Sequence, residues 1–333
     1  MQAATYDRRG PAREVLKVAE RPTPEPAPGE VRVKVAVSAV NPSDTKGRGT
    51  WLGATQMLFA LITPHQDGSG VIDKVGAGVP ASRVGERVWV YMAQRGRPFG
   101  TAAEYTCVPS ERAVTLPAMA SFADGACLGI PVMTAHYCLF RDGPVTGKTV
   151  LVQGGAGGVG FYGVQLAKWG GAKKVIATVS RDAQAAQARL AGADAVVNYK
   201  QADAIEQVRA AAGGPAAIDH IVEVNFGANV AMDIAVIARN GVIGSYGSDS
   251  NPEPVLPYGA FTQKDVTLRV ALIYEARQSS RDTAARDINA MLEKGQLKHQ
   301  IAARFPLEQI AAAHEAMESG KTVGKLLVDV ASL

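Results

Sequence analysis

Three glycines directly follow an apolar stretch near the middle of the chain, at Gly155, Gly157 and Gly160. An apolar strand is expected around Val150, and an amphipathic helix is expected from Phe161 to Trp169. In this context the first glycine permits a tight turn, the second lets the backbone approach a pyrophosphate, and the third lets the helix pack on the strand. Phosphates would then bind free N–H groups at the helix N-terminus. The flanking elements therefore favour a dinucleotide-binding site over a glycine-rich loop without a ligand.

The residues after the next expected strand indicate which dinucleotide binds. Lys174–Val179 is short, β-branched and apolar, which predicts a second parallel strand. A site that prefers NAD places Asp or Glu about twenty residues past the glycines, to accept hydrogen bonds from the ribose hydroxyls. This chain has Ser180 and Arg181 there, and a guanidinium can bind a 2′-phosphate through two parallel hydrogen bonds. NADPH is therefore favoured over NADH. Asp182 either weakens this preference or only caps the helix expected at Ala183–Leu190.

The pattern around these motifs predicts the elements that position them. Residues up to about 125 are rich in Val, Gly and Pro and predict an irregular β-rich module. From Asp124 onward, helices and strands alternate, which predicts an α/β fold with a doubly wound parallel sheet of the Rossmann type. The strands expected in the first module are Val31–Ala39, Gly70–Val75 and Arg87–Tyr91; those in the second lie at Val150, Val175, Ala195–Val197, Ile218–Val222 and Val242–Tyr246, after a helix at Cys127–Phe140.

The last part of the chain, from about residue 266, mixes strand and helix patterns. Its expected elements are a strand at Val266–Ile273, a helix near Asp282–Lys294, a strand at Ile301–Phe305, a helix at Leu307–Ser319 and a strand at Val323–Val330. With 333 residues, the chain is long enough for two domains that each bury a core.

Composition agrees with a globular enzyme in the cytoplasm. The chain is 47% hydrophobic and 20% charged, with a formal net charge of +4 that is spread along the sequence. It has no dense basic cluster of the kind that binds nucleic acid. No apolar signal core opens the chain, and no stretch reaches the length of a membrane span. These features predict neither a nucleic-acid partner nor a membrane partner.

The three cysteines and five histidines do not predict a metal or disulfide site. Cys107, Cys127 and Cys138 are too few and too scattered for a disulfide framework, and they predict buried, inert thiols. None of the histidines has a neighbour at metal-ligand spacing, and only His65 lies near an expected site.

The chain resembles the medium-chain dehydrogenase/reductase superfamily, and within it the zinc-free quinone oxidoreductases related to zeta-crystallin. The resemblance runs essentially end to end and is carried by Val40–Thr45, His65–Ile72, Val84–Val88, Gly155–Gly160, Ala191–Asp194, Asn198-Tyr199 and Gly324–Leu326. It implies a GroES-like catalytic domain at 1–125 and a Rossmann NADPH-binding domain at 126–265, with the cofactor cleft between them. Residues 266–333 would complete the cofactor sheet edge and return to the catalytic domain. The resemblance also implies a homodimer, with edge strands near Val266–Ile273 as the candidate contact.

Comparison with zinc-dependent relatives indicates a reaction without metal. Those relatives carry a ligand Cys early in the catalytic domain and a ligand His in a Gly-His-Glu triplet. The stretch Asn41–Thr45 contains no Cys, and Gln66 stands where the His would be. A catalytic zinc site needs three protein ligands, and this chain does not supply them at these positions.

The resemblance also implies which residues bind the cofactor. Asn41 and Thr134 would border the nicotinamide, and Asn41 would offer amide hydrogen bonds to the substrate. The remaining contacts would come from the pyrophosphate loop Ala156, Gly157, Gly158 and Val159; from Ser180, Arg181 and Tyr199 around the 2′-phosphate and adenine; from Asn229, Tyr246, Gly247 and Ser248 along the floor; and from Ala271, Leu272 and Ile273 at the carboxamide.

Lys46 departs from the family, which often has Tyr at this position near the acceptor. Lys46 could donate a proton or bind an acidic acceptor, or it could be a solvated surface residue. Thr50–Phe59 also lacks an obvious counterpart. With Trp89, Tyr91, Phe99 and Tyr258, this segment forms a hypothetical aromatic pocket for the acceptor.

Three functions fit the sequence. The first is NADPH:quinone oxidoreductase, in which hydride passes from NADPH to a quinone without zinc. The second is an NADPH-dependent reductase of activated C=C bonds in enones, enals or acrylate-like acids, since conjugation stabilises the incoming charge there too. The third is a non-enzymatic NADPH-binding or RNA-binding protein, which the weak charge disfavours.

Overall fold

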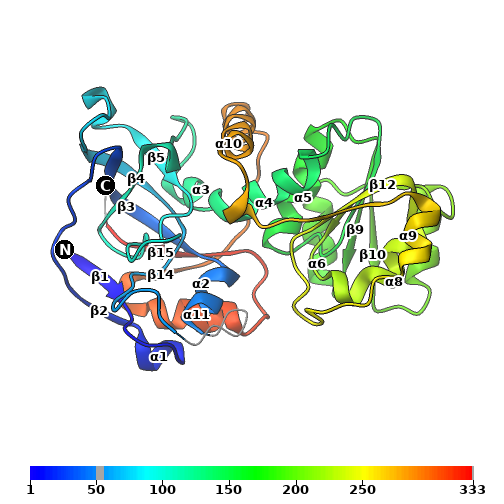
Figure 1. Ribbon diagram of the computed structural model, residues 1–333, viewed down its shortest axis with the longest axis horizontal. Helices are drawn as coiled ribbons and strands as arrows, with labels where there is room; N and C mark the ends of the chain where they lie inside the picture. The colour runs from blue at the N-terminus through cyan, green and yellow to red at the C-terminus, as the bar shows by residue number, and fades with distance from the viewer. Residues whose placement is uncertain (50–55, 332–333) are drawn as a thin grey trace. The chain divides into compact units, whose positions relative to one another are not determined.

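Runs of β-branched residues build two large sheets in the computed structural model, which describes residues 1–49 and 56–331. Each sheet lies in its own compact unit (Figure 1). Met1–Ile130 and Ala285–Leu333 make up the first unit, and Pro131–Ala284 makes up the second unit. The N-terminal and C-terminal parts of the chain therefore fold together.

The sheet of the second unit is parallel throughout, as the alternation of helix and strand predicts. Its six strands follow the order β10-β9-β8-β11-β12-β13. Their bounds are β8 (Thr149–Val152), β9 (Lys174–Val179), β10 (Ala195–Asn198), β11 (Ile218–Glu223), β12 (Ile237–Ser245) and β13 (Thr267–Val270). The chain order reverses between β8 and β11, and ligands of such sheets bind beyond the carboxyl ends of the strands at that point.

Helices cover both faces of this sheet because side chains alternate along each strand. Leu151, Ile221 and Ile243 point to one face and share an apolar core with α7, α8 and α9. Val152 and Val222 point to the other face and contact α5 at Gly163. The helices of this unit are α4 (Gly129–Phe140), α5 (Gly158–Trp169), α6 (Asp182–Leu190), α7 (Ala204–Ala212), α8 (Phe226–Val236) and α9 (Tyr258–Lys264). The fold is therefore doubly wound.

Several predicted elements of this region were wrong in extent, among them the strand predicted at Val266–Ile273, of which β13 covers only Thr267–Val270. The strand predicted from Val242 begins at Ile237, because Asn240 adopts a positive φ of 58° and lets β12 continue through a stretch that looks like a turn. The helix predicted at Cys127–Phe140 is α4, which begins two residues later at Gly129, and a separate helix, α3 (Phe122–Ala126), precedes it. A capping box at Ser121 starts α3, and the carboxylate of Asp67 accepts the Ile130 N–H in the first turn of α4.

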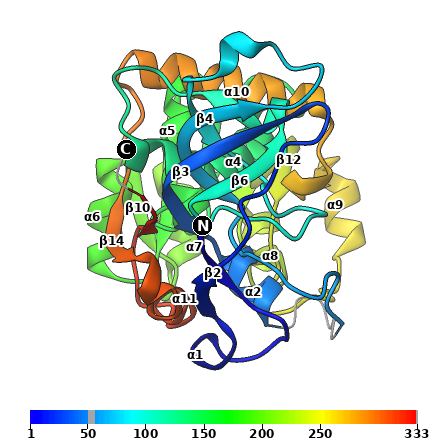
Figure 2. The ribbon, with the colours of Figure 1, turned by 90° about the vertical axis from the view of Figure 1, so that its left-hand side faces the viewer.

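The main sheet of the first unit is mixed and joins the two ends of the chain. Its path is β14-β15-β3-β4-β5-β7, and β6 also pairs with β3 (Figure 2). The strands are β3 (Glu30–Val40), β4 (Asp67–Val75), β5 (Arg87–Val90), β6 (Tyr105–Pro109), β7 (Ala113–Thr115), β14 (Ile301–Pro306) and β15 (Lys325–Asp329); β1 (Gln2–Thr5) and β2 (Lys17–Glu20) form a separate pair. From Val35 to Val40, β3 is buried at every residue and leads directly into Asn41.

The C-terminal segment divides between the two sheets. β13 ends the parallel sheet, whereas β14 and β15 extend the sheet of the first unit, where Leu326 pairs with Val40 of β3. The remaining helices are α1 (Ala12–Val15), α2 (Pro42–Arg48), α10 (Gln278–Glu293) and α11 (Ile310–Glu318), with short 3₁₀ turns at Ala81–Arg83, Ser110–Arg112, Ile273–Glu275 and Leu307–Gln309. Both views show α2 beside α11 (Figures 1 and 2).

Candidate active site

The glycine loop forms the start of α5 and leaves its backbone open. Gly157 is the N-cap, and the first-turn N–H groups of Gly158, Val159 and Gly160 have no acceptor within the helix. A Cβ at Gly158 would meet no atom of the described residues within 4 Å. A Cβ at Gly160 would lie 2.2 Å from the Gly154 carbonyl oxygen. Gly160, the third glycine of the motif, is therefore required because a larger residue would not fit. The open first turn of α5 fits a pyrophosphate.

The first glycine has a different role from the expected one. The positive φ of the turn belongs to Gly154, at 67°, and not to Gly155. Gly155 instead allows close packing, because its added Cβ would lie 2.6 Å from the Cβ of Ala177 on β9. The turn and the close contact are thus provided by neighbouring glycines.

The residues predicted at the adenine end lie beside one another at the ends of two strands. Val179 of β9 pairs with Asn198 of β10, and the Tyr199 N–H donates to the Val179 carbonyl at 3.0 Å. Ser180 and Arg181 follow β9 directly, and Arg181 is exposed. The hydroxyl of Ser180 donates to Gln184 Oε1 at 2.8 Å, which orients it at the start of α6.

Asp182 is the first residue of α6, and Arg181 is the N-cap. The suggestion that Asp182 caps this helix was therefore wrong by one position. A carboxylate in the first turn still favours the positive end of the helix dipole, which gives Asp182 a role in the helix itself.

The other predicted cofactor residues of this unit also follow its strands. Tyr246, Gly247 and Ser248 come after β12, and Ala271, Leu272 and Ile273 come after β13. The Ala271 N–H donates to the Ser245 carbonyl at 2.7 Å, which joins the two segments. Thr134 lies in α4 and is 6% exposed. Thr134 apart, these residues follow strands toward the carboxyl edge where dinucleotides bind in this fold class.

A buried polar network lies next to the glycine loop, and the sequence did not reveal it. The Gly154 N–H donates to Thr178 Oγ1 at 3.0 Å, and Thr178 Oγ1 donates to Gln153 Oε1 at 2.6 Å. Gln153 Nε2 then donates to Asp233 Oδ1 at 2.9 Å. Asp233 is fully buried in α8, beside the carboxyl of Glu223.

The buried carboxyls of Glu223 and Asp233 lie close enough to repel each other when both are ionised. Burial and the neighbouring Glu223 raise the pKa of Asp233 well above its ordinary value. Glu223 also accepts from the Asn225 N–H and from Asn229 Nδ2, the latter at 2.9 Å. Asn229, predicted to contact cofactor, thus uses its side-chain amide to hold Glu223.

In the first unit, Asn41 lies in a buried cluster of charged groups. It is the N-cap of α2, and its backbone N–H donates to Asp44 Oδ2 at 2.7 Å. Its side-chain amide contacts Asp67 on β4 and Lys325 on β15. Burial and the Asp67 charge raise the pKa of Asp44 to about 8. Burial also raises the pKa of Asp67, although Lys325 opposes this shift.

The lysine that contacts Asn41 is therefore Lys325, which sequence reasoning missed. The signal was a lysine within the apolar strand Lys325–Asp329, where four of five residues are buried. Lys46 is half-buried on α2, and its role in the reaction stays a prediction.

A directed hydrogen-bond chain reaches the backbone of Asp67. Arg48 Nε donates to His314 Nδ1 at 3.3 Å, so His314 carries its hydrogen on Nε2, which lies 2.9 Å from His65 Nε2. His65 Nδ1 lies 2.7 Å from Ser38 Oγ, which lies 2.7 Å from Thr101 Oγ1, and Thr101 donates to the Asp67 carbonyl at 2.6 Å. Because an arginine always donates, every hydrogen in this chain points toward Asp67. Burial lowers the pKa of both imidazoles, that of His314 to about 3.

The structure divides the residues of the predicted aromatic pocket. Trp89 and Tyr91 lie in the core, where Trp89 Nε1 donates to Asn289 and the Tyr91 hydroxyl donates to the Glu111 carbonyl. Phe99 and Tyr258 are 42% and 75% exposed. Thr50–Thr55 lies outside the described residues. Burial of Trp89 and Tyr91 removes both from the pocket hypothesis.

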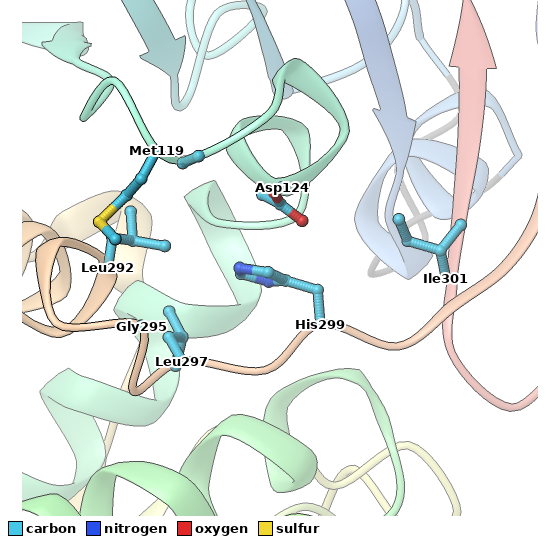
Figure 3. Close-up of a pocket in the computed structure, with 8 residues that line it drawn as sticks. Met119, Asp124, Leu292, Gly295, Leu297, His299 and Ile301 are labelled. Carbon is cyan, nitrogen blue, oxygen red and sulfur yellow. The ribbon is translucent and has the colours of Figure 1, made fainter.

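A separate pocket of about 510 Å³ lies in the first unit (Figure 3). It is lined by Met119, Ala120, Asp124, Leu292, Gly295, Leu297, His299 and Ile301. Burial lowers the pKa of His299, and the charge of Asp124 opposes that shift. None of these residues was predicted to bind cofactor or substrate.

The position of the zinc-ligand histidine is filled by an amide. Gln66 Nε2 donates to Gln94 Oε1 at 3.0 Å. Within residues 1–49 and 56–331, no three His, Cys, Asp or Glu side chains gather as a metal site. The residues present do not fit a catalytic zinc ion. Over the same residues, no helix is long and apolar enough to cross a membrane.

The cysteines are buried and reduced. Cys107, Cys127 and Cys138 are free thiols, and burial raises the pKa of Cys107 and Cys138 to about 12. A thiol with a raised pKa is a poor nucleophile, so these two side chains serve packing.

Known families match both parts of the chain. Residues 27–118 match the alcohol dehydrogenase GroES-like domain, and residues 158–290 match the zinc-binding dehydrogenase family. A quinone oxidoreductase of Rattus norvegicus is 32% identical over 326 residues, which cover 95% of this chain and 94% of the relative.

Solved structures share the architecture over nearly the whole chain. An NAD-dependent alcohol dehydrogenase matches with a TM-score of 0.89 and 29% identity, over 99% of this chain and 100% of its own. The Escherichia coli quinone oxidoreductase complexed with NADPH matches with a TM-score of 0.85 and 26% identity, over 99% and 100%. A 2-haloacrylate reductase matches with a TM-score of 0.85 and 26% identity, over 100% of both chains.

A GroES-like unit together with a parallel dinucleotide-type unit defines the medium-chain dehydrogenase/reductase class. Within this class, the chain belongs to the quinone oxidoreductase family.

Proposed function

We propose that this protein is an NADPH-dependent quinone oxidoreductase that transfers hydride without zinc. The observation that carries the proposal is the open first turn of α5 beside Ser180 and Arg181, in a chain whose curated relatives are quinone oxidoreductases. The position after β9 that bears an acidic residue in NAD-preferring sites holds Ser180 here, which supports NADPH over NADH. The E. coli relative with bound NADPH supports the same cofactor.

The proposed roles follow from where each residue lies. When bound, NADPH would supply the hydride from its dihydronicotinamide. The pyrophosphate would be bound by Ala156–Val159, and the 2′-phosphate and adenine would be bound by Ser180, Arg181 and Tyr199. The floor of the cofactor site would be lined by Asn229 and Tyr246–Ser248. The nicotinamide end would be contacted by Ala271–Ile273 and Thr134. Asn41 would contact the nicotinamide and the acceptor. By the resemblance, Gln66 stands where zinc-dependent relatives have a ligand His, and Asn41–Thr45 contains no Cys, which supports a hydrogen-bonded acceptor in place of a metal-bound one.

A second candidate function is reduction of activated C=C bonds. The structural match to a 2-haloacrylate reductase favours it, because the same fold and cofactor serve both reactions. The two functions are separated by following NADPH oxidation with 1,4-benzoquinone, 9,10-phenanthrenequinone, a 2-alkenal and a 2-haloacrylate. Fastest turnover of the quinones supports the first function, and fastest turnover of the alkenes supports the second. Oxidation with none of them would contradict both and favour a binding protein without enzymatic activity.

Arg181 provides the test of cofactor choice. Arg181→Glu replaces a donor to the 2′-phosphate with a repelling carboxylate, and it should raise the Kd of NADPH about 10- to 100-fold. The Kd of NADH should change little, as measured by quenching of protein fluorescence. Arg189→Glu on the same helix is exposed and changes the net charge equally, so it serves as the control. Equal weakening by both variants, or tighter binding of NADH by the natural chain, would refute the assignment.

Lys46 is tested by replacement with alanine. If Lys46 contacts the acceptor, Lys46→Ala should alter quinone turnover while NADPH affinity stays intact. Unchanged kinetics would remove Lys46 from the site.

The assembly and location are part of the proposal. β13 is the last strand of its sheet, and Val270 on it is 79% exposed, which supports pairing of β13 edges in a homodimer. Sedimentation velocity would show a dimer if this is right and a monomer if it is wrong. A cytoplasmic location, and domain boundaries at 125/126 and 265/266, complete the proposal.

A further inference from the structure

The side-chain amide of Asn41 is held on both sides by charged groups. Its Nδ2 donates to Asp67 Oδ2 at 2.7 Å, and its Oδ1 accepts from Lys325 Nζ at 2.5 Å. Lys325 Nζ also lies 3.4 Å from Asp67 Oδ2. Asn41, Asp67 and Lys325 are 3%, 0% and 7% exposed, so water competes little for these bonds.

These contacts permit one orientation of the amide. Turning it over would place Nδ2 against the Lys325 ammonium, donor against donor, and Oδ1 against the Asp67 carboxylate. Both contacts would leave buried polar groups unpaired, which is costly. One N–H of Nδ2 is used by Asp67, and within residues 1–49 and 56–331 the second N–H has no acceptor.

The backbone also holds Lys325 in place. β15 pairs with β3 so that Leu326 lies opposite Val40, which brings Lys325 next to Asn41. Gly324 before it has a φ of 115°, and an added Cβ there would lie 2.8 Å from the Gln300 carbonyl oxygen. Asp67 is held in turn by the Ile130 N–H, at 2.9 Å from its Oδ1. The cation, the amide and the carboxylate therefore have little freedom to rearrange.

We propose that Lys325 is a positioning residue that fixes and polarises the Asn41 amide as a hydrogen-bond donor to the oxygen of the acceptor. A cation at the amide oxygen withdraws electron density from the nitrogen, so it strengthens the remaining N–H as a donor. That the acceptor is a quinone rests on the proposed function. Lys325 acts through Asn41 and does not itself touch the acceptor.

This arrangement favours a particular class of acceptor. An amide stabilises negative charge on oxygen but does not release a proton. It therefore suits acceptors whose reduction leaves a delocalised oxyanion, as quinones do, and not simple ketones, whose reduction leaves a basic alkoxide. In the complete reaction a quinone takes up the hydride of NADPH and one proton from water, giving the quinol and NADP⁺.

The test uses two variants and a matched control. Lys325→Met removes the cation, and Lys325→Met with Asp67→Asn also removes the carboxylate, so that no buried charge is left unpaired. The control is Arg304→Met with Asp329→Asn, an ion pair between β14 and β15 whose side chains are 49% and 45% exposed. Thermal unfolding shows which variants are folded.

Kinetics should separate positioning from stability. In the folded variants, kcat with a quinone should fall about tenfold or more, because the hydrogen-bond donor to the oxyanion is weakened. The Kd of NADPH should stay within about twofold, because the glycine loop is unchanged. The control pair should keep the natural kcat. A kcat within about twofold of the natural one in the folded double variant would overturn the proposal.

A spectroscopic measurement gives an answer independent of turnover. The Nδ2 protons of Asn41, assigned by their loss in Asn41→Asp, should be shifted downfield in the natural protein, and Lys325→Met with Asp67→Asn should move them toward the position of free amides. Unshifted protons in the natural protein would overturn the inference. If no acceptor is reduced by the natural protein while the protons are shifted, the proposed function fails and the positioning of Asn41 stands.

Discussion

The two units bury carboxyl groups beside their candidate sites in different ways. In the second unit, Glu223 and Asp233 contact each other, side-chain amides and a backbone N–H. In the first unit, Asp67 contacts the Lys325 ammonium as well as an amide and a backbone N–H. In the Glu223–Asp233 pair, burial and mutual repulsion favour a protonated carboxyl, whereas in the other cluster the Lys325 cation stabilises the ionised form of Asp67.

The two clusters of buried carboxyl groups also hold different parts of the candidate site in place. The raised pKa of Asp233 favours a neutral Gln153–Asp233 network, and this network ends on the backbone of the glycine loop at Gly154. Supporting a backbone loop in this way requires a rigid network but does not require an electric field from a charged group. The Asp67–Lys325 pair ends on a side-chain amide, Asn41, and places a full positive charge at its oxygen. Burying a cation is costly, and under our proposal this charge acts on the Asn41 amide.

The largest expected effect comes from breaking the ion pair on one side. Lys325→Met leaves the Asp67 charge buried without its cation, and it should lower the free energy of unfolding by about 3–5 kcal/mol. Adding Asp67→Asn should restore most of this loss, because removing both charges leaves no ion uncompensated. Urea unfolding measures both. A single variant as stable as the natural chain would mean that the pair carries no charge.

The next effect, which is smaller when counted per pH unit, distinguishes Asp44 from its neighbours. Its pKa is about 8 in the folded chain against an ordinary 3.8, so the folded state binds a proton that the unfolded state releases. The stability from this proton is complete below about pH 4 and is lost as the pH rises through about 8. Over this range, the natural chain should lose up to about 1.4 kcal/mol per pH unit relative to Asp44→Asn.

Urea unfolding of both chains at several pH values between these limits gives the slope. Asp329→Asn, at a half-exposed position on β15, is the control and should leave the slope unchanged. Parallel stability profiles for the natural chain and Asp44→Asn would show that Asp44 is ionised in the folded state.

Much of the second unit could be predicted because its signals are local. A strand, a glycine turn and a helix are contiguous around Gly157, and each parallel strand is a short β-branched run. Residues that follow such strands meet at one edge by the rules of the fold, which placed Ser180, Tyr199 and Tyr246 correctly at the carboxyl edge. Exceptions were elements whose boundaries depend on distant contacts, such as α4, which begins where Asp67 accepts the Ile130 N–H.

The cluster around Asn41 could not be predicted because its members are far apart in sequence. Lys325 and Asn41 are 284 residues apart, and they meet only because β15 pairs with β3 in one register. A shift of that register by one residue would turn Lys325 to the other face of the sheet. The lysine considered for the site from the sequence was Lys46, which is close to Asn41 in sequence, and the role of Lys46 stays a prediction.

The smallest expected effect tests the second unit, where Asp233 is expected to be neutral. Because a protonated carboxyl is neutral, Asp233→Asn replaces an acid with a near isostere that can still accept from Gln153 and donate to Glu223. The free energy of unfolding should change by no more than about 1 kcal/mol near neutral pH. As the pH rises toward the raised pKa of Asp233, the natural chain should lose stability that Asp233→Asn keeps. Urea unfolding at neutral and alkaline pH measures both effects. A loss of more than about 3 kcal/mol at neutral pH, the size expected for a broken buried ion pair, would show that Asp233 is charged and that the two interiors do not differ as described.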